Sequence, residues 1–89
     1  MYFVYLLVTK NKNRTISYVG YTNNINKRLK LHNSSKGAKF TRGRKWKLVY
    51  YEKLPSKKKA LMREYEIKKN RKLRNYLKEK FTKEVYFAK

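Results

Sequence analysis

Apolar, β-branched and aromatic residues are concentrated in three short stretches of the chain that suit β-strands. Residues 2–8 form the first stretch and precede a polar segment, which predicts a strand that ends in a turn. Residues 16–21 follow after a short connection, so an antiparallel pairing of these two strands is the simplest geometry. Residues 46–52 have the same character and predict a third strand.

Three further segments have the pattern of helices. Asn24 is a favourable N-cap residue, and apolar positions recur at helical spacing after it, which predicts a helix over residues 24–33. Ser56 is the corresponding cap for a strongly charged helix over residues 57–69, and a shorter helix is expected over residues 71–80. The order ββαβαα predicts a small α/β domain of the α+β type, in which helices flank a three-stranded antiparallel sheet.

We expect a single domain over residues 1–89, because a chain of 89 residues can form one compact core but is too short for two. Its segment 34–47 is basic, contains two glycines and has few apolar positions, which predicts a loop that is mobile or ordered by a ligand. At the C-terminus, we expect residues 82–89 to fray.

The charge of the chain defines its class of partner. It has 26 lysines and arginines against 5 acidic residues, a formal net charge of +21, and both halves of the chain are basic. A polyanion compensates such a charge, so DNA is the expected partner and RNA is left open. The longest apolar run, residues 2–8, is far shorter than the ~20 residues that a membrane-spanning helix needs. The sequence has no cysteine, which excludes disulfides and cysteine zinc sites, and we expect a cytoplasmic protein.

Carboxylates are scarce, and this narrows the metal chemistry open to the chain. The acidic residues are all glutamates, so a two-metal site bridged by several carboxylates is disfavoured and a site for one metal fits better. In the helix expected over residues 57–69, a rotation of about 100° per residue places Glu64 within the apolar arc and Glu66 outside it. We therefore expect Glu64 to point inward, although Lys68 falls in the same arc.

The order and spacing of several residues resemble a known family. The tripeptides FVY at residues 3–5 and YVG at residues 18–20 resemble the paired GIY and YIG sequences of the GIY-YIG nuclease superfamily. Arg28 and His32, one helical turn apart, stand where that family has an arginine and often a histidine, and Glu64 resembles its metal-binding glutamate. In the first tripeptide Phe and Val replace Gly and Ile, a change that is common in the small stand-alone members.

This resemblance implies a GIY-YIG fold and a DNA endonuclease that hydrolyses phosphodiester bonds, in repair, recombination or structure-specific cleavage. It also implies Mg²⁺ or Mn²⁺ at a single site that contains Glu64. Cutting a phosphodiester requires an activated water and compensation of developing charge. We assign Tyr18 as the general base, since nearby cations favour its phenolate, with Tyr5 as its partner. Arg28 would neutralise phosphate oxygens, and His32 would either assist proton transfer or hold phosphate.

Residues 36–44 resemble the loop that is typical of the small stand-alone members. Phe40 and Trp46, interleaved with basic residues, suit base stacking and phosphate contact, and the alternative is a solvated basic surface. The residues expected to bind DNA are Lys36, Lys39, Thr41, Arg42, Arg44 and Lys45.

Each candidate residue also has a purely structural interpretation. The two tyrosines lie in strand-forming segments where tyrosine is common. His32 alone would most often lie on a helix surface, and Glu64 alone would most often form an ion pair with Arg63 or Lys68. Only their joint arrangement indicates catalysis.

The alternative function is a non-catalytic basic module with a GIY-YIG-like fold that binds DNA or RNA. A third possibility is a nuclease that needs a partner protein for specificity.

Overall fold

Three strands and three helices make up the computed structural model of the chain. It describes residues 1–11, 14–34 and 43–87, with side chains up to Glu79 apart from that of Asn11. The elements are β1 (Tyr2–Asn11), β2 (Arg14–Thr22), α1 (Ile25–Asn33), β3 (Lys47–Leu54), α2 (Lys57–Lys69) and α3 (Arg71–Phe87). This order confirms the predicted ββαβαα arrangement.

The sheet has β1 at its centre, in the order β2-β1-β3, and both neighbours pair with it in antiparallel orientation. The register of the first hairpin places Tyr5 opposite Gly20 and Leu7 opposite Tyr18. Because side chains alternate along a strand, Tyr5 and Leu7 point to one face of the sheet and Leu6 points to the other. β2 is an edge strand, so no further strand pairs with its outer edge in the part of the chain that the structure describes.

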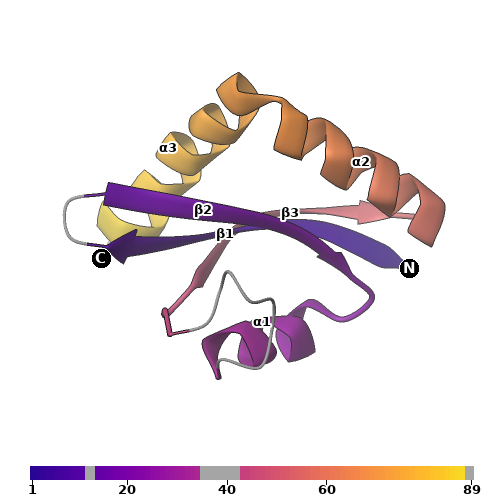
Figure 1. Ribbon diagram of the computed structural model, residues 1–89, viewed down its shortest axis with the longest axis horizontal. Coiled ribbons are helices and arrows are strands. Elements are labelled where there is room, and N and C mark those ends of the chain that lie inside the picture. The colour runs from indigo at the N-terminus through magenta and orange to yellow at the C-terminus, as the bar shows by residue number, and fades with distance from the viewer. Residues whose placement is uncertain (12–13, 35–42, 88–89) are drawn as a thin grey trace.

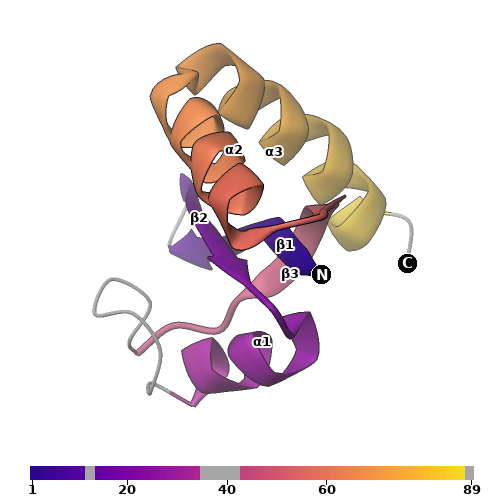
Figure 2. The same cartoon turned by 90° about the vertical axis from the view of Figure 1, so that its right-hand side faces the viewer.

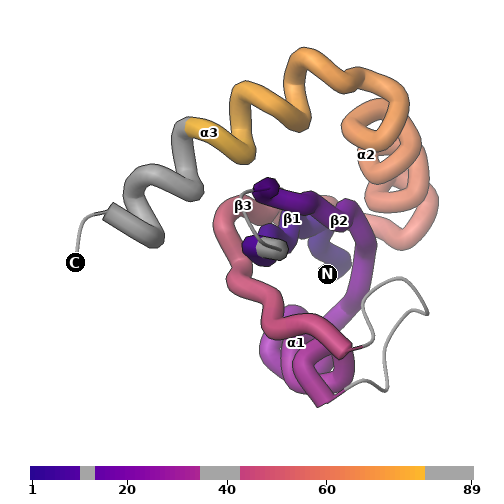
Figure 3. The backbone as a smooth tube through the Cα atoms, turned by 60° about the vertical axis from the view of Figure 1, so that its left-hand side comes forward, coloured from indigo at the N-terminus to yellow at the C-terminus, as the bar shows by residue number. Residues whose placement is uncertain are grey.

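The helices cover the two faces of the sheet unequally. Figures 1 and 2 show α2 and α3 together on one face and α1 on the other. Figure 3 shows the sharp bend between α2 and α3, where the side chain of Asn70 accepts a hydrogen bond from the backbone N–H of Leu73 at 3.0 Å. Two apolar clusters result. The cluster under α2 and α3 contains Val4, Leu6, Val8, Val19, Val49, Ala60, Ile67 and Leu77, and the cluster on the α1 face contains Tyr5, Leu7 and Trp46.

The caps of the first two helices agree with the sequence analysis. The Asn24 side chain accepts a hydrogen bond from the Lys27 N–H at 3.1 Å, and the Ser56 hydroxyl accepts one from the Lys59 N–H at 3.2 Å. Each cap satisfies a backbone donor that has no partner within the helix. The predicted starts of α1 and α2 are therefore confirmed to within one residue, and α2 also ends at Lys69 as predicted.

Four of the predicted elements, the three strands and the last helix, are longer in the structure. The first hairpin extends until Asn11 pairs with Arg14, because backbone pairing continues past the last apolar side chain. The third strand runs to Leu54, and α3 runs to Phe87 rather than to residue 80, since no glycine or proline interrupts the segment. Mobility of the loop 34–47 and fraying of residues 82–89 stay predictions. Within the described ranges, no helix is long and apolar enough to cross a membrane.

Candidate active site

Two tyrosines and a histidine form the centre of the site on the α1 face of the sheet. The hydroxyl of Tyr5 lies 2.8 Å from Nε2 of His32. The ring of Tyr18 is 6.5 Å from that of Tyr5 and 5.2 Å from that of His32, measured between centroids. Tyr5 is 3% exposed and His32 is fully buried, whereas Tyr18 is only partly buried. The structure thus brings three of the predicted residues together, from β1, β2 and α1.

Gly20 leaves the space that the tyrosine cluster occupies. A Cβ atom at this position would lie 2.4 Å from the hydroxyl oxygen of Tyr5 and 3.1 Å from a ring carbon of Tyr18. Carbon atoms in contact prefer separations of about 3.5–4.0 Å, so a side chain here would displace Tyr5. The glycine of the second tripeptide therefore has a steric role in this chain.

Arg28 supplies positive charge to the same cluster. It lies one turn before His32 on α1, so the two side chains share a face of the helix. The Arg28 guanidinium lowers the pKa of both Tyr5 and Tyr18, through its charge and through hydrogen bonding to their hydroxyls. The structure thus brings the arginine close to both tyrosines.

Burial nevertheless controls the protonation of the cluster. It raises the pKa of Tyr5 to about 12 and also raises that of Tyr18, and it outweighs the opposing effect of Arg28. Burial and then the Arg28 charge lower the pKa of His32. Arg28 lowers the pKa of Tyr18, as we expected of a nearby cation. The net pKa of Tyr18 is nevertheless raised, so the expectation that its phenolate is favoured is wrong for the free protein. At neutral pH both tyrosines are protonated and His32 is neutral.

Glu64 approaches the tyrosines from α2, which packs on β1 and β2. Its side chain is 15% exposed whereas that of Glu66 is 62% exposed, which confirms the inward orientation predicted from helical geometry. The Glu64 carboxylate is close enough for its charge to raise the pKa of both Tyr5 and Tyr18. Glu64 also forms the expected ion pair with Lys68, at 3.6 Å, but this pair is weak because Lys68 is half exposed.

The donor side chains described for this site fit a single, weakly enclosed metal ion and no larger centre. Within the described residues, no group of three or more histidine, cysteine, aspartate or glutamate side chains could hold a metal. Both oxygens of Glu52 already accept hydrogen bonds, and Glu66 and Glu79 are exposed. Glu64 is thus the described carboxylate that suits a metal site, and one carboxylate suffices for Mg²⁺, which usually keeps several waters.

A shallow groove of about 340 Å³ connects the site with the start of α2. Two cations, Arg28 from α1 and Lys57 from α2, lie along it. Because it offers positive charge beside aromatic and amide groups, it suits a phosphodiester backbone. The lining residues are Tyr2, Tyr21, Thr22, Asn23, Arg28 and Lys57.

Trp46 belongs to the core, which corrects the expectation that it stacks on bases. It is 3% exposed, and its ring lies 6.3 Å from that of Tyr18. The Asn33 side chain holds its backbone on both sides, since it accepts from the Trp46 N–H at 2.6 Å and donates to the Trp46 carbonyl at 3.2 Å. Sequence reasoning missed Asn33, because a polar residue at a helix end carries no signal of so distant a partner.

The expected DNA contacts lie mostly outside the described residues. Arg44 is half-buried and Lys45 is exposed, next to the start of β3. The Lys45 carbonyl accepts a hydrogen bond of 2.6 Å from the hydroxyl of Thr9, which fixes the backbone here. The residues outside the described ranges are Lys36, Lys39, Thr41 and Arg42, together with Phe40.

The fold and the tyrosine cluster agree with a comparison against protein families. Residues 1–78 match the family model for the GIY-YIG catalytic domain, so the chain belongs to the GIY-YIG family, a superfamily of nucleases. Within it, the chain is similar to small bacterial proteins named UPF0213. One from Clostridium perfringens is 50% identical over 70 residues, which cover 78% of this chain and 72% of the relative. Another from Bacillus velezensis is 38% identical over 92 residues, which cover 99% and 90%. No solved structure matches the chain.

Proposed function

We propose that this protein is a metal-dependent endonuclease that hydrolyses phosphodiester bonds in DNA, with RNA left open as a substrate. One observation carries the proposal beyond family membership. The positive charge of Arg28 and the negative charge of Glu64 act on the same two tyrosine hydroxyls, from α1 and from α2. A binding surface has no need of such convergence, whereas phosphodiester hydrolysis needs a proton acceptor, a cation and a metal ligand together.

Tyr18 is the proposed general base because it is the more exposed of the two tyrosines and lies on the edge strand. Its raised pKa means that it is protonated in the free protein, and Glu64 is one cause of this shift. A divalent cation held by Glu64 would supply positive charge beside the phosphate and would offset the effect of Glu64 on the tyrosines. Arg28 lowers the pKa of Tyr18 in the same sense, and its forked donors suit the nonbridging phosphate oxygens.

Tyr5 and His32 are proposed to act as a pair that supports Tyr18. Burial raises the pKa of Tyr5 to about 12 and His32 is neutral, so the proposal has the Tyr5 hydroxyl donating to Nε2 and the imidazole proton on Nδ1. Of the two roles considered for His32, proton transfer through Tyr5 fits the geometry. Holding phosphate does not, because His32 is fully buried.

DNA binding is proposed for the groove between Arg28 and Lys57 and for the basic residues before β3. The positive charge of both regions favours contact with phosphate groups, and the net charge of +21 extends the attraction for DNA over the whole domain. We further propose a cytoplasmic location, a role in repair, recombination or structure-specific cleavage, and a partner protein for specificity. The residues of the basic segment proposed to bind DNA are Lys36, Lys39, Thr41, Arg42, Arg44 and Lys45.

A cleavage assay on linear, flap and branched DNA with Mg²⁺ or Mn²⁺ tests the function. We expect wild type to cut at least one of these substrates, and Tyr18→Phe and Glu64→Ala each to lower kcat by about 10²-fold or more. Glu66→Ala is the matched control, since Glu66 is an exposed glutamate on the same helix, and it should cut at the wild-type rate. Equal rates for wild type and Glu64→Ala on every substrate would contradict the catalytic assignment.

The charge of the chain favours one rival, a non-catalytic module that binds DNA or RNA. Such a module would show affinity that falls steeply with salt and is unchanged by Tyr18→Phe or Glu64→Ala. Filter binding across a salt series, run on the same variants without metal, measures this affinity. Salt-dependent binding by a protein that fails to cut in the cleavage assay would indicate the rival.

A further inference from the structure

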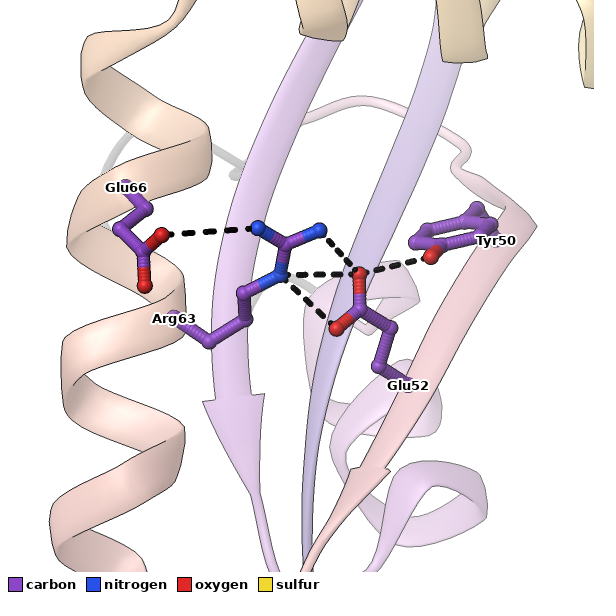
Figure 4. A network of polar contacts seen from close by, with 4 residues as sticks. All are labelled: Tyr50, Glu52, Arg63 and Glu66. Carbon is purple, nitrogen blue, oxygen red and sulfur yellow. Dashed lines mark hydrogen bonds and ion pairs between the residues drawn. The ribbon is translucent and has the colours of Figure 1, made fainter.

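A fork of hydrogen bonds joins α2 to the far edge of the sheet (Figure 4). Nε of Arg63 donates to Oε1 and Oε2 of Glu52 at 2.8 and 3.1 Å, and a terminal nitrogen of Arg63 donates to Oε2 at 2.9 Å. The hydroxyl of Tyr50 donates to the same Oε2 at 2.6 Å. The side chains of Arg63 and Glu52 are 31% and 22% exposed, so water weakens the pair only in part. This fork is the best-defined polar contact between α2 and a strand in the part of the chain that the structure describes.

Arg63 and Glu64 lie on opposite sides of the buried stripe of α2. Ala60 and Ile67 are the buried residues of this helix and face the sheet. At about 100° per residue, Arg63 projects to one side of that stripe and Glu64 to the other. Figure 4 shows Arg63 reaching from α2 across the sheet to Glu52 on β3, the edge strand opposite β2. Rotation of α2 about its own axis would therefore break the fork and move Glu64 at the same time.

Apolar packing alone resists such a rotation weakly. Of the two buried side chains, Ala60 is a single methyl group and only Ile67 interlocks with the sheet. Side-chain tips lie about 5–6 Å from a helix axis, so a rotation of about 20° would shift the Glu64 carboxylate by about 2 Å. A misplacement of about 1 Å in an active site can lower a rate by about 10²-fold.

We propose that Arg63 and Glu52 are positioning residues, whose fork fixes the rotation of α2 and thereby holds the Glu64 carboxylate beside Tyr5 and Tyr18. The catalytic consequence rests on the proposed function. The positional claim stands by itself, because it concerns the place of one carboxylate relative to two rings.

Glu52→Gln tests the claim, and Glu66→Gln is its matched control. Both glutamates contact Arg63, but Glu66 is an exposed partner at 3.7 Å and takes no part in the fork. Each substitution removes one negative charge beside the same guanidinium, so the two variants differ in geometry rather than in charge. Arg63→Gln removes the fork from the other side, and Arg63→Lys retains the charge without the forked donors.

The first measurement is the NMR spectrum of the ¹³C-labelled tyrosine rings in metal-free protein. Glu64→Gln defines the ring shifts of Tyr5 and Tyr18 when no carboxylate charge is nearby. We expect Glu52→Gln and Arg63→Gln to move these shifts toward the Glu64→Gln values, Arg63→Lys to lie between, and Glu66→Gln to match wild type. Wild-type ring shifts in Glu52→Gln and Arg63→Gln would overturn the proposal, whatever the two variants do to thermal stability.

The second measurement is DNA cleavage well below the unfolding temperature of every variant. We expect kcat to fall by about tenfold or more in Glu52→Gln and Arg63→Gln, with KM for DNA within about twofold of wild type. Loss of stability with unchanged kcat would mean that the fork only stabilises the fold, and would overturn the catalytic consequence. If Glu64→Gln itself cuts DNA as wild type does, the proposed function fails, while the ring shifts still decide the positional claim.

Discussion

Replacement of Gly20 by alanine is the smallest change that should disturb the site, and its cost follows from the structure. The new Cβ would lie 2.4 Å from the Tyr5 hydroxyl oxygen and 2.6 Å from the ring carbon that bears it. To reach ordinary contact, the end of the ring must move by about 1 Å. His32 holds that hydroxyl at 2.8 Å in a buried environment, so the same movement strains or breaks their hydrogen bond.

The expected destabilisation is about 2 kcal/mol. Overpacking of a filled core costs about 1–3 kcal/mol, and a lost hydrogen bond costs about 1 kcal/mol. Alanine recovers about 0.4–1 kcal/mol because it restricts the unfolded chain more than glycine does. For a domain of this size, the net loss lowers Tm by about 10 °C. Activity should fall further, by about 10²-fold, since Tyr5 supports the ring that we propose as the base.

Thermal unfolding followed by circular dichroism and a cleavage assay measure the two effects separately. A double-mutant cycle with Tyr5→Phe gives the sharper test, because it removes the hydroxyl oxygen nearest to the new Cβ. We expect the free-energy cost of Gly20→Ala to shrink by about 1 kcal/mol in the Tyr5→Phe background, with part of the cost remaining from the ring carbon. Additive costs, or a Gly20→Ala variant with wild-type stability and activity, would refute the steric role of Gly20.

Two further predictions concern charge. Burial alone would raise the pKa of Glu52, but hydrogen bonds from Arg63 and Tyr50 outweigh it and the pKa is lowered from its ordinary value of 4.5. The fork therefore stabilises the fold above that pH, by about 1 kcal/mol, and this contribution is lost as the pH falls through the lowered pKa. Urea unfolding should show wild type more stable than Glu52→Gln at pH 7, with a difference that shrinks as the pH falls below 4.5, and a constant difference would contradict the assignment. Along the groove, Lys57→Ala should raise KM for DNA several-fold and reduce the slope of log affinity against log salt by about 1, whereas its exposed neighbour Lys58 should matter less. Equal effects of Lys57→Ala and Lys58→Ala would show that the groove contributes no more than general charge.

Local signals were enough to predict the secondary structure, apart from its ends. The bounds of α2 followed from its cap at Ser56 and its charged pattern, because capping is decided within one helical turn. The extra pairs at the tip of the first hairpin could not be read in the same way. Asn11 and Arg14 are polar, and backbone ladders extend wherever the register allows, without regard to side-chain character.

Long-range contacts explain what the sequence left undecided in the site. His32 lies in a polar helical segment, and such a sequence predicts a surface position. It is fully buried because α1 packs against the tyrosines of two strands. The direction of Glu64 was accessible from helical periodicity, since Ala60 and Ile67 mark the buried stripe. The partner of Arg63 was not, because Glu52 lies on a strand and no periodicity links the two elements. Family resemblance, rather than physical pattern, was what joined Tyr5 with Tyr18.

The proposed catalytic cluster is also the core of the α1 face. Tyr5, Leu7 and Trp46 are its buried members, and Tyr18 packs against them. The same burial that stabilises this side of the sheet raises the pKa of both tyrosines and keeps them protonated. A more polar cluster would lower those pKa values but would remove apolar area from a domain with little to spare. Charges at Arg28 and Glu64, which lie outside this core, therefore adjust the pKa of the two tyrosines without loss of apolar packing in the sheet.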